Sequence, residues 1–346
     1  MNEWTSWIRS GGKLDAAAVG SIVGELLGGR AGDEEKADFL EALHQRGESP
    51  HEIRLFALAF LDRAVPFPVT PEIGGVLDVC GTGGDRLGLF NISTAVMFVA
   101  AGAGARLVKH GNRGITSQSG GADVLEALGV PPDVPEDRLQ GMLEEAGAVF
   151  LFAPRFHPAF KSVAPARKIL ASRGSPSIFN MLGPLLNPAR PAYQLTGVFS
   201  EALLPLYAEV LPGLQRESAW IVHGSAGGTA VMDEISTLGP TLVAEVQRGN
   251  VTHRELQQAD LGVPPGDIEE LRGGDAERNA AFLEEILDGR RHGSARDIVL
   301  VNSAAALRVA GLAEDWPEAM ARAGDAIDSG SARDVLATMR RVAGGG

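Results

Sequence analysis

The stretch Val76-Leu77-Asp78-Val79-Cys80-Gly81-Thr82-Gly83-Gly84-Asp85 sets the expected architecture, because a short apolar run ends there in a glycine-rich turn. A helical pattern follows at residues 91–103, and the next apolar run, 106–109, predicts a second strand that also ends in a glycine-rich loop. A third strand is expected at 149–153. Short apolar runs that alternate with helical patterns are typical of βαβ units, so the sequence predicts an α/β fold with a mainly parallel central sheet.

The chain before this stretch has a different pattern. From residue 14 to about 64, apolar residues recur at three- and four-residue spacing, as in amphipathic helices. The proline-rich stretch 65–71 then separates this part from the βαβ pattern. We therefore expect a small helical domain at residues 1–70 and a larger α/β domain at 75–346, in a chain of 346 residues that exceeds the usual size of a single core.

Further elements are expected beyond the third strand. Residues 179–188 contain too many prolines for a long helix and are expected to form a short helical connector. The remaining patterns predict helices at 157–170, 298–309 and 316–327 and strands at 220–223 and 242–246.

The composition limits the possible functions. A net charge of −13 opposes binding to nucleic acid or to an anionic membrane, whereas 45% hydrophobic residues indicate a globular protein. Cys80 is the single cysteine, which excludes an intramolecular disulfide and fits a reducing compartment. The apolar run 95–105 is shorter than the ~18 residues that span a bilayer, and the N-terminal residues lack the apolar core of a signal peptide, so we expect a cytoplasmic protein.

The first glycine-rich loop, residues 81–85, can bind an anion. Its glycines let backbone N–H groups approach closely, and the helix that begins near Asn91 offers unpaired N–H donors at its positive end. The spacing fits neither the Walker motif nor the dinucleotide motif. A plain tight turn is the alternative, and this loop by itself leaves both interpretations open.

The second loop, residues 109–121, is richer in polar groups. It contains two fixed cations, two amides, three hydroxyls and four glycines, a mixture that suits a diphosphate better than a solvated connector. Because both loops follow neighbouring strands of one parallel sheet, we expect them to face a common crevice at the carboxyl ends of the strands.

Three further positions are candidates for chemistry. Asp233 and Glu234 are adjacent acids, and beside two anion-binding loops they suit Mg²⁺, although such acids are more often solvated surface residues. From its position alone, Arg167 is most simply interpreted as an exposed helical cation. His157 is most simply interpreted as a histidine that caps a helix or forms a hydrogen bond in the core. The sequence shows no recognisable Ser-His-Asp arrangement or Cys/His metal cluster.

At these residues the sequence resembles the anthranilate phosphoribosyltransferase family. The resemblance extends over almost the whole chain, from about Phe39 to Arg340. The motifs that carry it stand in the family order and are GTGGD (81–85), FNIST (90–94), KHGNR (109–113), SGGADVLEALGV (119–130), FAPRFHPAF (152–160), FNMLGPLLNPA (179–189) and MDEIS (232–236).

The resemblance implies a fold and a reaction. The fold is a helical domain, made of the N-terminal helices and a segment at about 157–188, hinged to a larger α/β domain like that of nucleoside phosphorylases. The reaction transfers the phosphoribosyl group of phosphoribosyl pyrophosphate to the amine of anthranilate in tryptophan biosynthesis, with Mg²⁺ as cofactor. A homodimer through the helical domain is also implied.

The resemblance also implies roles for individual residues. Lys109, Asn112 and Arg113 would be catalytic, and Ser93, Asp233 and Glu234 would serve the metal. The anthranilate site would comprise Gly81, His110, Asn112, His157, Arg167 and Pro184. The phosphoribosyl pyrophosphate site would comprise Gly81, Gly84, Asp85, Leu89, Asn91, Ile92, Ser93, Thr94, Lys109, His110, Gly111, Asn112, Arg113, Gly114, Ile115, Thr116, Ser117 and Gly121.

The sequence departs from the family pattern at a few positions. Leu89, Gln118 and Gly121 replace side chains that could contact phosphate, and the connector 171–176 is a few residues longer than usual. Two rival functions are a pyrimidine nucleoside phosphorylase, which would not call for both KHGNR and the acid pair, and a nucleic-acid-binding relative of the same fold, which should carry basic stripes.

Overall fold

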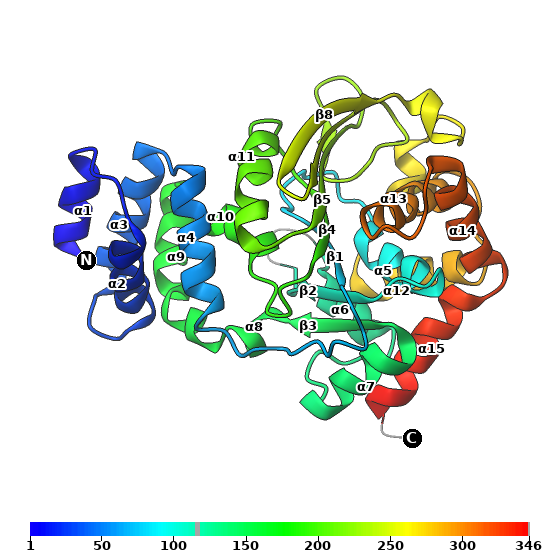
Figure 1. Ribbon diagram of the computed structural model, residues 1–346, viewed down its shortest axis with the longest axis horizontal. Helices are drawn as coiled ribbons and strands as arrows, with labels where there is room; N and C mark the ends of the chain where they lie inside the picture. Colours follow the sequence, from blue (N-terminus) through cyan, green and yellow to red (C-terminus); the bar gives the residue numbers. More distant parts are fainter. Residues whose placement is uncertain (115–117, 345–346) are drawn as a thin grey trace.

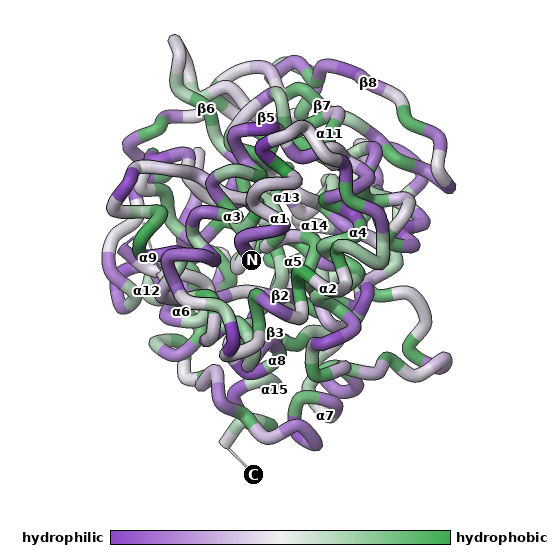
Figure 2. Tube along the Cα trace, turned by 90° about the vertical axis from the view of Figure 1, so that its left-hand side faces the viewer, coloured by the Kyte–Doolittle hydropathy of each residue, from purple (hydrophilic) through white to green (hydrophobic). Residues whose placement is uncertain are grey.

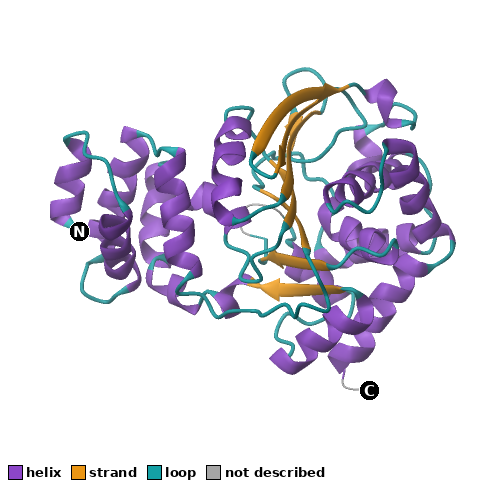
Figure 3. Cartoon of the chain, in the orientation of Figure 1, coloured by secondary structure: helices purple, strands orange, loops and turns teal. Residues whose placement is uncertain are grey.

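The computed structural model describes residues 1–114 and 118–344. It consists of a small helical domain beside a larger α/β domain whose central sheet separates two layers of helices (Figure 1, Figure 3). The predicted fold class is thus confirmed. None of the helices in the described part of the chain has the length and apolar character needed to cross a bilayer.

One of the two layers, called the helical layer below, combines helices from residues 2–61 and 153–210. Ser49 caps α4, since its side chain accepts a hydrogen bond from the Glu52 N–H. Three short 3-10 turns, Pro158–Ser162, Gly183–Leu185 and Leu211–Leu214, connect the later helices. The helices of this layer are α1 (Asn2–Arg9), α2 (Ala16–Leu27), α3 (Asp33–Arg46), α4 (Pro50–Leu61), α8 (Ala153–Phe156), α9 (Ala164–Arg173), α10 (Phe179–Leu182) and α11 (Leu203–Val210).

The single helix predicted at 157–170 is wrong. Within this range the chain forms the 3-10 turn Pro158–Ser162 and then α9, which begins at Ala164, because Pro158 and Pro165 each lack the N–H that a continuing helix needs. Proline is tolerated in a first turn, so each one begins a new short element. The predicted connector at 179–188 is confirmed as α10 followed by a 3-10 turn.

The sheet has the order β3-β2-β1-β4-β5-β7-β8, with β6 paired to β5. Neighbours from β3 to β5 are parallel, whereas β5 pairs antiparallel with β6 and β7, and β7 with β8. All five predicted strands are confirmed, while β4, β6 and β8 were not foreseen. The strands are β1 (Leu77–Gly81), β2 (Leu107–Gly111), β3 (Ala148–Phe152), β4 (Tyr193–Gly197), β5 (Ser218–Ser225), β6 (Val231–Met232), β7 (Thr241–Gln247) and β8 (Asn250–Leu256).

The two faces of the sheet belong to two hydrophobic cores. On β5, Ala219 and Ile221 pack toward the helical layer, whereas Trp220 and Val222 pack into the other core, as the alternation of a strand requires. The second core is covered by α5 (Ile92–Gly102), α6 (Gly121–Ala127), α7 (Glu136–Ala146), α12 (Ala276–Leu287), α13 (Ser294–Val309), α14 (Trp316–Asp328) and α15 (Ser331–Gly344).

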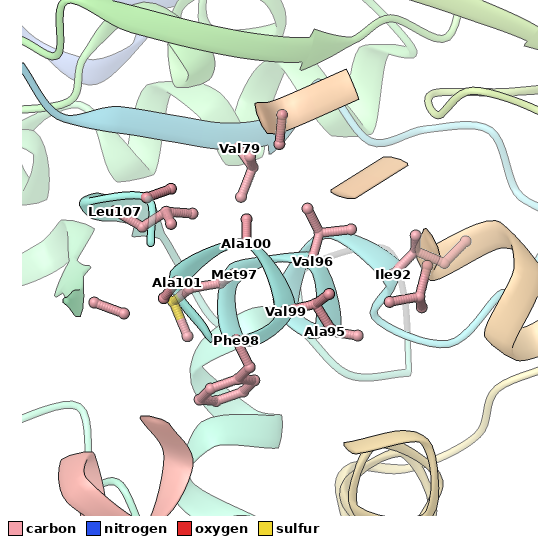
Figure 4. Packing of buried hydrophobic residues seen from close by; sticks show 14 of the residues in the cluster. Val79, Ile92, Ala95, Val96, Met97, Phe98, Val99, Ala100, Ala101 and Leu107 are labelled. Carbon is pink, nitrogen blue, oxygen red and sulfur yellow. The ribbon is translucent and has the colours of Figure 1, made fainter. Parts of the chain in front are cut away.

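Helix α5 lies at the centre of this second core. Its side chains are buried in all directions, with Val79 and Leu107 on the side that faces the strands (Figure 4). Figure 2 likewise shows hydrophobic residues along α5 in the interior and hydrophilic stretches on β8 at the periphery. The N-terminus of α5 is therefore held rigidly at the carboxyl edge of the sheet, where the first glycine-rich loop leads into it.

Candidate active site

The two glycine-rich loops leave the carboxyl ends of the neighbouring parallel strands β1 and β2, as predicted. In the first loop, Gly83 and Gly84 have φ values of 66° and 94°, a backbone conformation that side chains disfavour. A Cβ at Gly81 would collide with the Asp233 carboxylate, and a Cβ at Gly197 with the Asp233 main chain. Glycine at these positions thus lets the acid pair approach the loop.

The acids of the site lie close together. The Gly83 N–H donates to Asp233 Oδ2 at 2.7 Å. Burial, reinforced by the charge of Asp233, raises the pKa of Asp85 to about 6, and burial also raises the pKa of Asp233. The pKa of Glu234 lies well above its usual value because of burial and then the charge of Asp233. Burial thus opposes the ionisation of all three carboxyls.

Lys109 lies beneath both loops. Its side chain is 5% exposed, and Nζ donates to the Val79 carbonyl at 2.5 Å and to Ser93 Oγ at 3.0 Å. The charge of Lys109 lowers the pKa of Asp233 and Glu234 in opposition to burial. A buried ammonium group thus stands at the N-terminus of α5, next to the acids.

The remaining residues of the first loop and its helix differ in orientation. Leu89 packs partly buried against the second core and forms a backbone bridge with Arg272. Ile92 and Thr94 have buried side chains, so they can offer an anion only their backbone N–H groups. Asn91 stands at the N-cap of α5.

The second loop is described only in part, because Ile115, Thr116 and Ser117 lie outside the described residues. Asn112 and Gly114 are exposed, and Gly111 ends β2. Gly121 begins α6, where a Cβ would stand 3.4 Å from the Phe150 ring and 3.5 Å from Thr94 Oγ1. These are ordinary van der Waals distances, so the packing of α6 does not require glycine at this departure from the family pattern.

The Arg113 side chain is directed toward α6. Its guanidinium pairs with Asp123 at 2.8 Å and with Glu126 at 2.6 Å. Both carboxylates are partly exposed, so these ion pairs are weak enough for a competing phosphate to replace them. These ion pairs could not be predicted from the sequence, because the two acids follow Arg113 by 10 and 13 residues.

An aromatic cluster lies beside the loops, where the helical layer meets β2. The His110 and His157 rings are in T-shaped contact at 5.2 Å, and His157 contacts Phe160 at 5.1 Å. The Arg167 guanidinium lies over the Phe179 ring at 5.4 Å, and no carboxylate of residues 1–114 or 118–344 lies within 4.0 Å of it.

The two histidines of this cluster are neutral at physiological pH. Burial, with smaller contributions from His157 and Lys109, lowers the pKa of His110 to about 3, and burial also lowers that of His157. His157 Nε2 contacts the Leu186 carbonyl at 2.8 Å, whereas His110 Nε2 is buried without a partner in the described part of the chain. His110 Nε2 is therefore free to form a hydrogen bond with a bound molecule, as donor or acceptor according to the tautomer.

Buried polar residues that the sequence did not single out support this region. Asn187 donates to Asp78 Oδ2 at 2.9 Å and to the Val108 carbonyl at 2.6 Å, and the Pro184 carbonyl accepts from Gln194 at 2.8 Å. Asp78 in the otherwise apolar stretch Val76–Val79 was the only available signal, since its partners are far away in the sequence.

A helical bundle beside an α/β domain, with two glycine-rich loops next to an acid cluster, is the architecture of a class of glycosyltransferases. Residues 5–64 match the helical bundle domain of a glycosyl transferase family, and residues 74–333 match its a/b domain. An anthranilate phosphoribosyltransferase from Rhodospirillum rubrum is 44% identical over 97% of this chain and 94% of its own, and one from Rubrobacter xylanophilus is 45% identical over 92% and 90%.

Solved structures agree. The anthranilate phosphoribosyltransferase of Thermus thermophilus superposes with a TM-score of 0.89 at 36% identity over 98% of both chains. The Saccharomyces cerevisiae enzyme, in complex with PRPP and Mg, gives a TM-score of 0.86 at 27% identity over 99% of this chain and 97% of its own. This chain belongs to the anthranilate phosphoribosyltransferase family.

Proposed function

We propose that this chain transfers the phosphoribosyl group of phosphoribosyl pyrophosphate to the amine of anthranilate, in a Mg²⁺-dependent step of tryptophan biosynthesis. One observation carries the proposal: an acid cluster beside glycine-rich loops adjoins a neutral aromatic cluster, whose Arg167 has no carboxylate partner among the residues that the structure describes. The first part suits a diphosphate with its metal, and the second suits an aromatic carboxylate.

The residues present fit Mg²⁺. No three His, Cys, Asp or Glu side chains within residues 1–114 and 118–344 form a ready metal cage. This agrees with Mg²⁺, which typically takes one or two carboxylates and completes its shell with waters and substrate phosphates. Asp233, Glu234 and Ser93 would hold the ion, and when bound it would neutralise the pyrophosphate leaving group.

The loops would hold phosphoribosyl pyrophosphate. The backbone N–H groups of Gly81, Gly84 and the start of α5 would donate hydrogen bonds to the phosphates. Asp85 and Asn91 would lie at the edge of this site. Lys109 would stabilise the negative charge that develops on the leaving pyrophosphate. We also assign Asn112 and Arg113 to this step, Arg113 after it leaves Asp123 and Glu126.

The aromatic cluster would hold anthranilate. His157, His110 and Pro184 would line the flat ring, Arg167 would pair with the carboxylate, and Asn112 would orient the amine. The amine nitrogen would then attack the anomeric carbon as the bond to pyrophosphate breaks. Catalysis would consist mainly of positioning and of charge stabilisation, so no obligatory general base is assigned.

A fluorescence assay of anthranilate consumption tests this function. Consumption should require both phosphoribosyl pyrophosphate and Mg²⁺. A nucleoside with inorganic phosphate, the substrate pair of a pyrimidine nucleoside phosphorylase, should give no turnover. Turnover of the nucleoside pair without consumption of anthranilate would contradict the proposal.

The Arg167→Ala variant should chiefly weaken the use of anthranilate, because the substrate carboxylate loses its charged partner. A charged hydrogen bond is worth about 2 kcal/mol, so kcat/KM for anthranilate should fall roughly thirtyfold while the KM for phosphoribosyl pyrophosphate stays near normal. Lys168→Ala, which truncates the side chain of the next residue in α9, is the matched control. A selective loss of phosphoribosyl pyrophosphate binding would show that Arg167 serves the other substrate.

We also propose a cytoplasmic homodimer that forms through the helical domain. Trp7 on α1 is 52% exposed, one of the few large apolar side chains on the described surface, and such residues are often buried by a partner. Sedimentation equilibrium should give twice the chain mass of 36.2 kDa, and Trp7→Glu should shift the equilibrium toward the single chain. A wild-type protein that sediments at the mass of one chain would contradict the dimer.

A further inference from the structure

A buried asparagine of α12 joins the two anion-binding loops. Asn279 is 1% exposed, and its Nδ2 donates to Asn91 Oδ1 at 2.9 Å and to Ser119 Oγ at 2.8 Å. Its Oδ1 accepts from the Gly274 N–H at 2.8 Å. Nδ2 also has a longer contact of 3.3 Å with the Gly274 carbonyl, but an amide NH₂ has two hydrogens and the two shorter bonds are the better partners for them. One side chain thus connects the N-cap of α5, to which the first loop leads, with the end of the second loop.

The segment before α12 is packed tightly against residues 88–91, which lead from the first loop into α5. The Gly273 N–H donates to the Gly88 carbonyl at 2.9 Å, and a Cβ at Gly273 would stand 2.8 Å from the Leu89 carbonyl oxygen. Phe282 of α12 contacts Phe90 with ring centroids 4.6 Å apart. Helix α12 therefore cannot shift relative to residues 88–91 without breaking several contacts, so Asn279 is held in a fixed place.

This arrangement fixes the orientation of the Asn91 amide. Asn91 Oδ1 accepts from Asn279 and also from Ser119 Oγ at 3.3 Å, so its Nδ2 group must be turned away from both donors. Asn91 Nδ2 has a long contact of 3.4 Å with the Ser119 carbonyl. With its oxygen occupied, Asn91 can present N–H donors, not an acceptor, to an anion at the N-terminus of α5.

We propose that Asn279 is a positioning residue for phosphoribosyl pyrophosphate: it orients the Asn91 amide and sets the spacing between the two loops. The inference rests on the proposed function of those loops. Asn279 itself lies behind them and acts through Asn91 and Ser119. Within residues 1–114 and 118–344, the hydrogen bonds of Asn279 reach Asn91, Ser119 and Gly274 and none reaches the aromatic cluster, so its effect should be confined to one of the two substrates.

The test is Asn279→Leu, which keeps the approximate volume and removes every side-chain hydrogen bond. The KM for phosphoribosyl pyrophosphate should rise about tenfold or more, because a lost buried hydrogen bond typically has that effect on an equilibrium, while the KM for anthranilate changes less than about twofold. Ile286→Ala on the same helix is the matched control, since Ile286 is fully buried and makes apolar contacts alone. That control should lower the melting temperature without raising the KM.

A double-mutant cycle separates positioning from general damage. In an Asn91→Ala background, Asn279→Leu should raise the KM for phosphoribosyl pyrophosphate by much less than in the wild type, because the group that it orients is gone. If Asn279→Leu does not fold, Ser119→Ala removes one of the two bonds and should raise the same KM severalfold.

The outcomes distinguish the inference from the function on which it rests. A wild-type protein that does not consume anthranilate would refute the proposed function. An active wild type, with Asn279→Leu or Ser119→Ala at a normal KM, would overturn the positioning role. Equal increases in both KM values, or additive effects in the cycle, would also overturn it, since they indicate a general structural role.

Discussion

The combined change of Asp233→Asn and Glu234→Gln is expected to lower kcat/KM by about a thousandfold or more while the protein stays folded. The two acids would hold the metal that neutralises the leaving pyrophosphate, and an amide cannot replace a carboxylate in that role. The hydrogen bond that Asp233 Oδ2 accepts from Gly83 can be kept by an amide oxygen. Steady-state rates over a Mg²⁺ titration measure the effect.

The same variant, although less active, should be at least as stable as the wild type. Burial raises the pKa of Asp233 and Glu234, so at neutral pH their ionised forms disfavour the folded state, and neutral amides remove that penalty. Without Mg²⁺, the melting temperature should therefore be unchanged or higher than that of the wild type. Mg²⁺ with phosphoribosyl pyrophosphate should stabilise the wild type and have little effect on the variant.

Another Asp-Glu pair provides the control. Asp33→Asn with Glu34→Gln changes the same two residue types in the first turn of α3, where both are exposed and far from the loops. Its rate should equal that of the wild type. A near-normal rate and Mg²⁺ dependence in the variant of Asp233 and Glu234 would remove both acids from the metal site.

The sequence predicted those parts of the fold that depend on local pattern. The strands β1, β2 and β3 are short apolar runs, and glycines follow β1 and β2, so these signals can be read from the local sequence alone. Strand β4 was missed because Gln194 and Thr196 look like surface residues, although both are fully buried and Gln194 Nε2 donates to Thr196 Oγ1 at 2.7 Å. Strand β8 was missed because most of its residues are exposed at the edge of the sheet.

The same distinction applies to the site. The glycine loops could be recognised because glycines and donors are adjacent in sequence, and the parallel sheet then brings them together. The direction of each side chain could not be recognised. Arg113 turns toward Asp123 because α6 begins there, and Asn279 reaches Asn91 across 188 residues of sequence. Such contacts depend on tertiary packing, which no single-sequence pattern contains.

Lys109→Met should lower kcat/KM for phosphoribosyl pyrophosphate by on the order of a hundredfold or more, the usual effect of removing a preorganised charge from a developing anion. Nζ is held between the Val79 carbonyl and Ser93, so the cation is placed before substrate binds. We expect kcat to fall as well as KM to rise, since the charge on pyrophosphate grows as the bond breaks. Measurements at saturating anthranilate give both constants.

Two further variants decide whether this loss is specific. Lys36 is similarly buried, at 3% exposed, and like Lys109 its Nζ makes two hydrogen bonds, here to two main-chain carbonyls. Lys36→Met should therefore lower the free energy of unfolding by a similar amount without the loss of rate. Leu89→Thr adds the hydroxyl that the family pattern leads us to expect, but a neutral contact is worth only ~1 kcal/mol, so the KM should change less than about tenfold. If Leu89→Thr gives a large gain while Lys109→Met remains near normal, the neutral contacts outweigh the buried cation. The order that we expect is the reverse, because a desolvated ammonium group beside the leaving group interacts with a full charge, whereas Leu89 is turned toward the core.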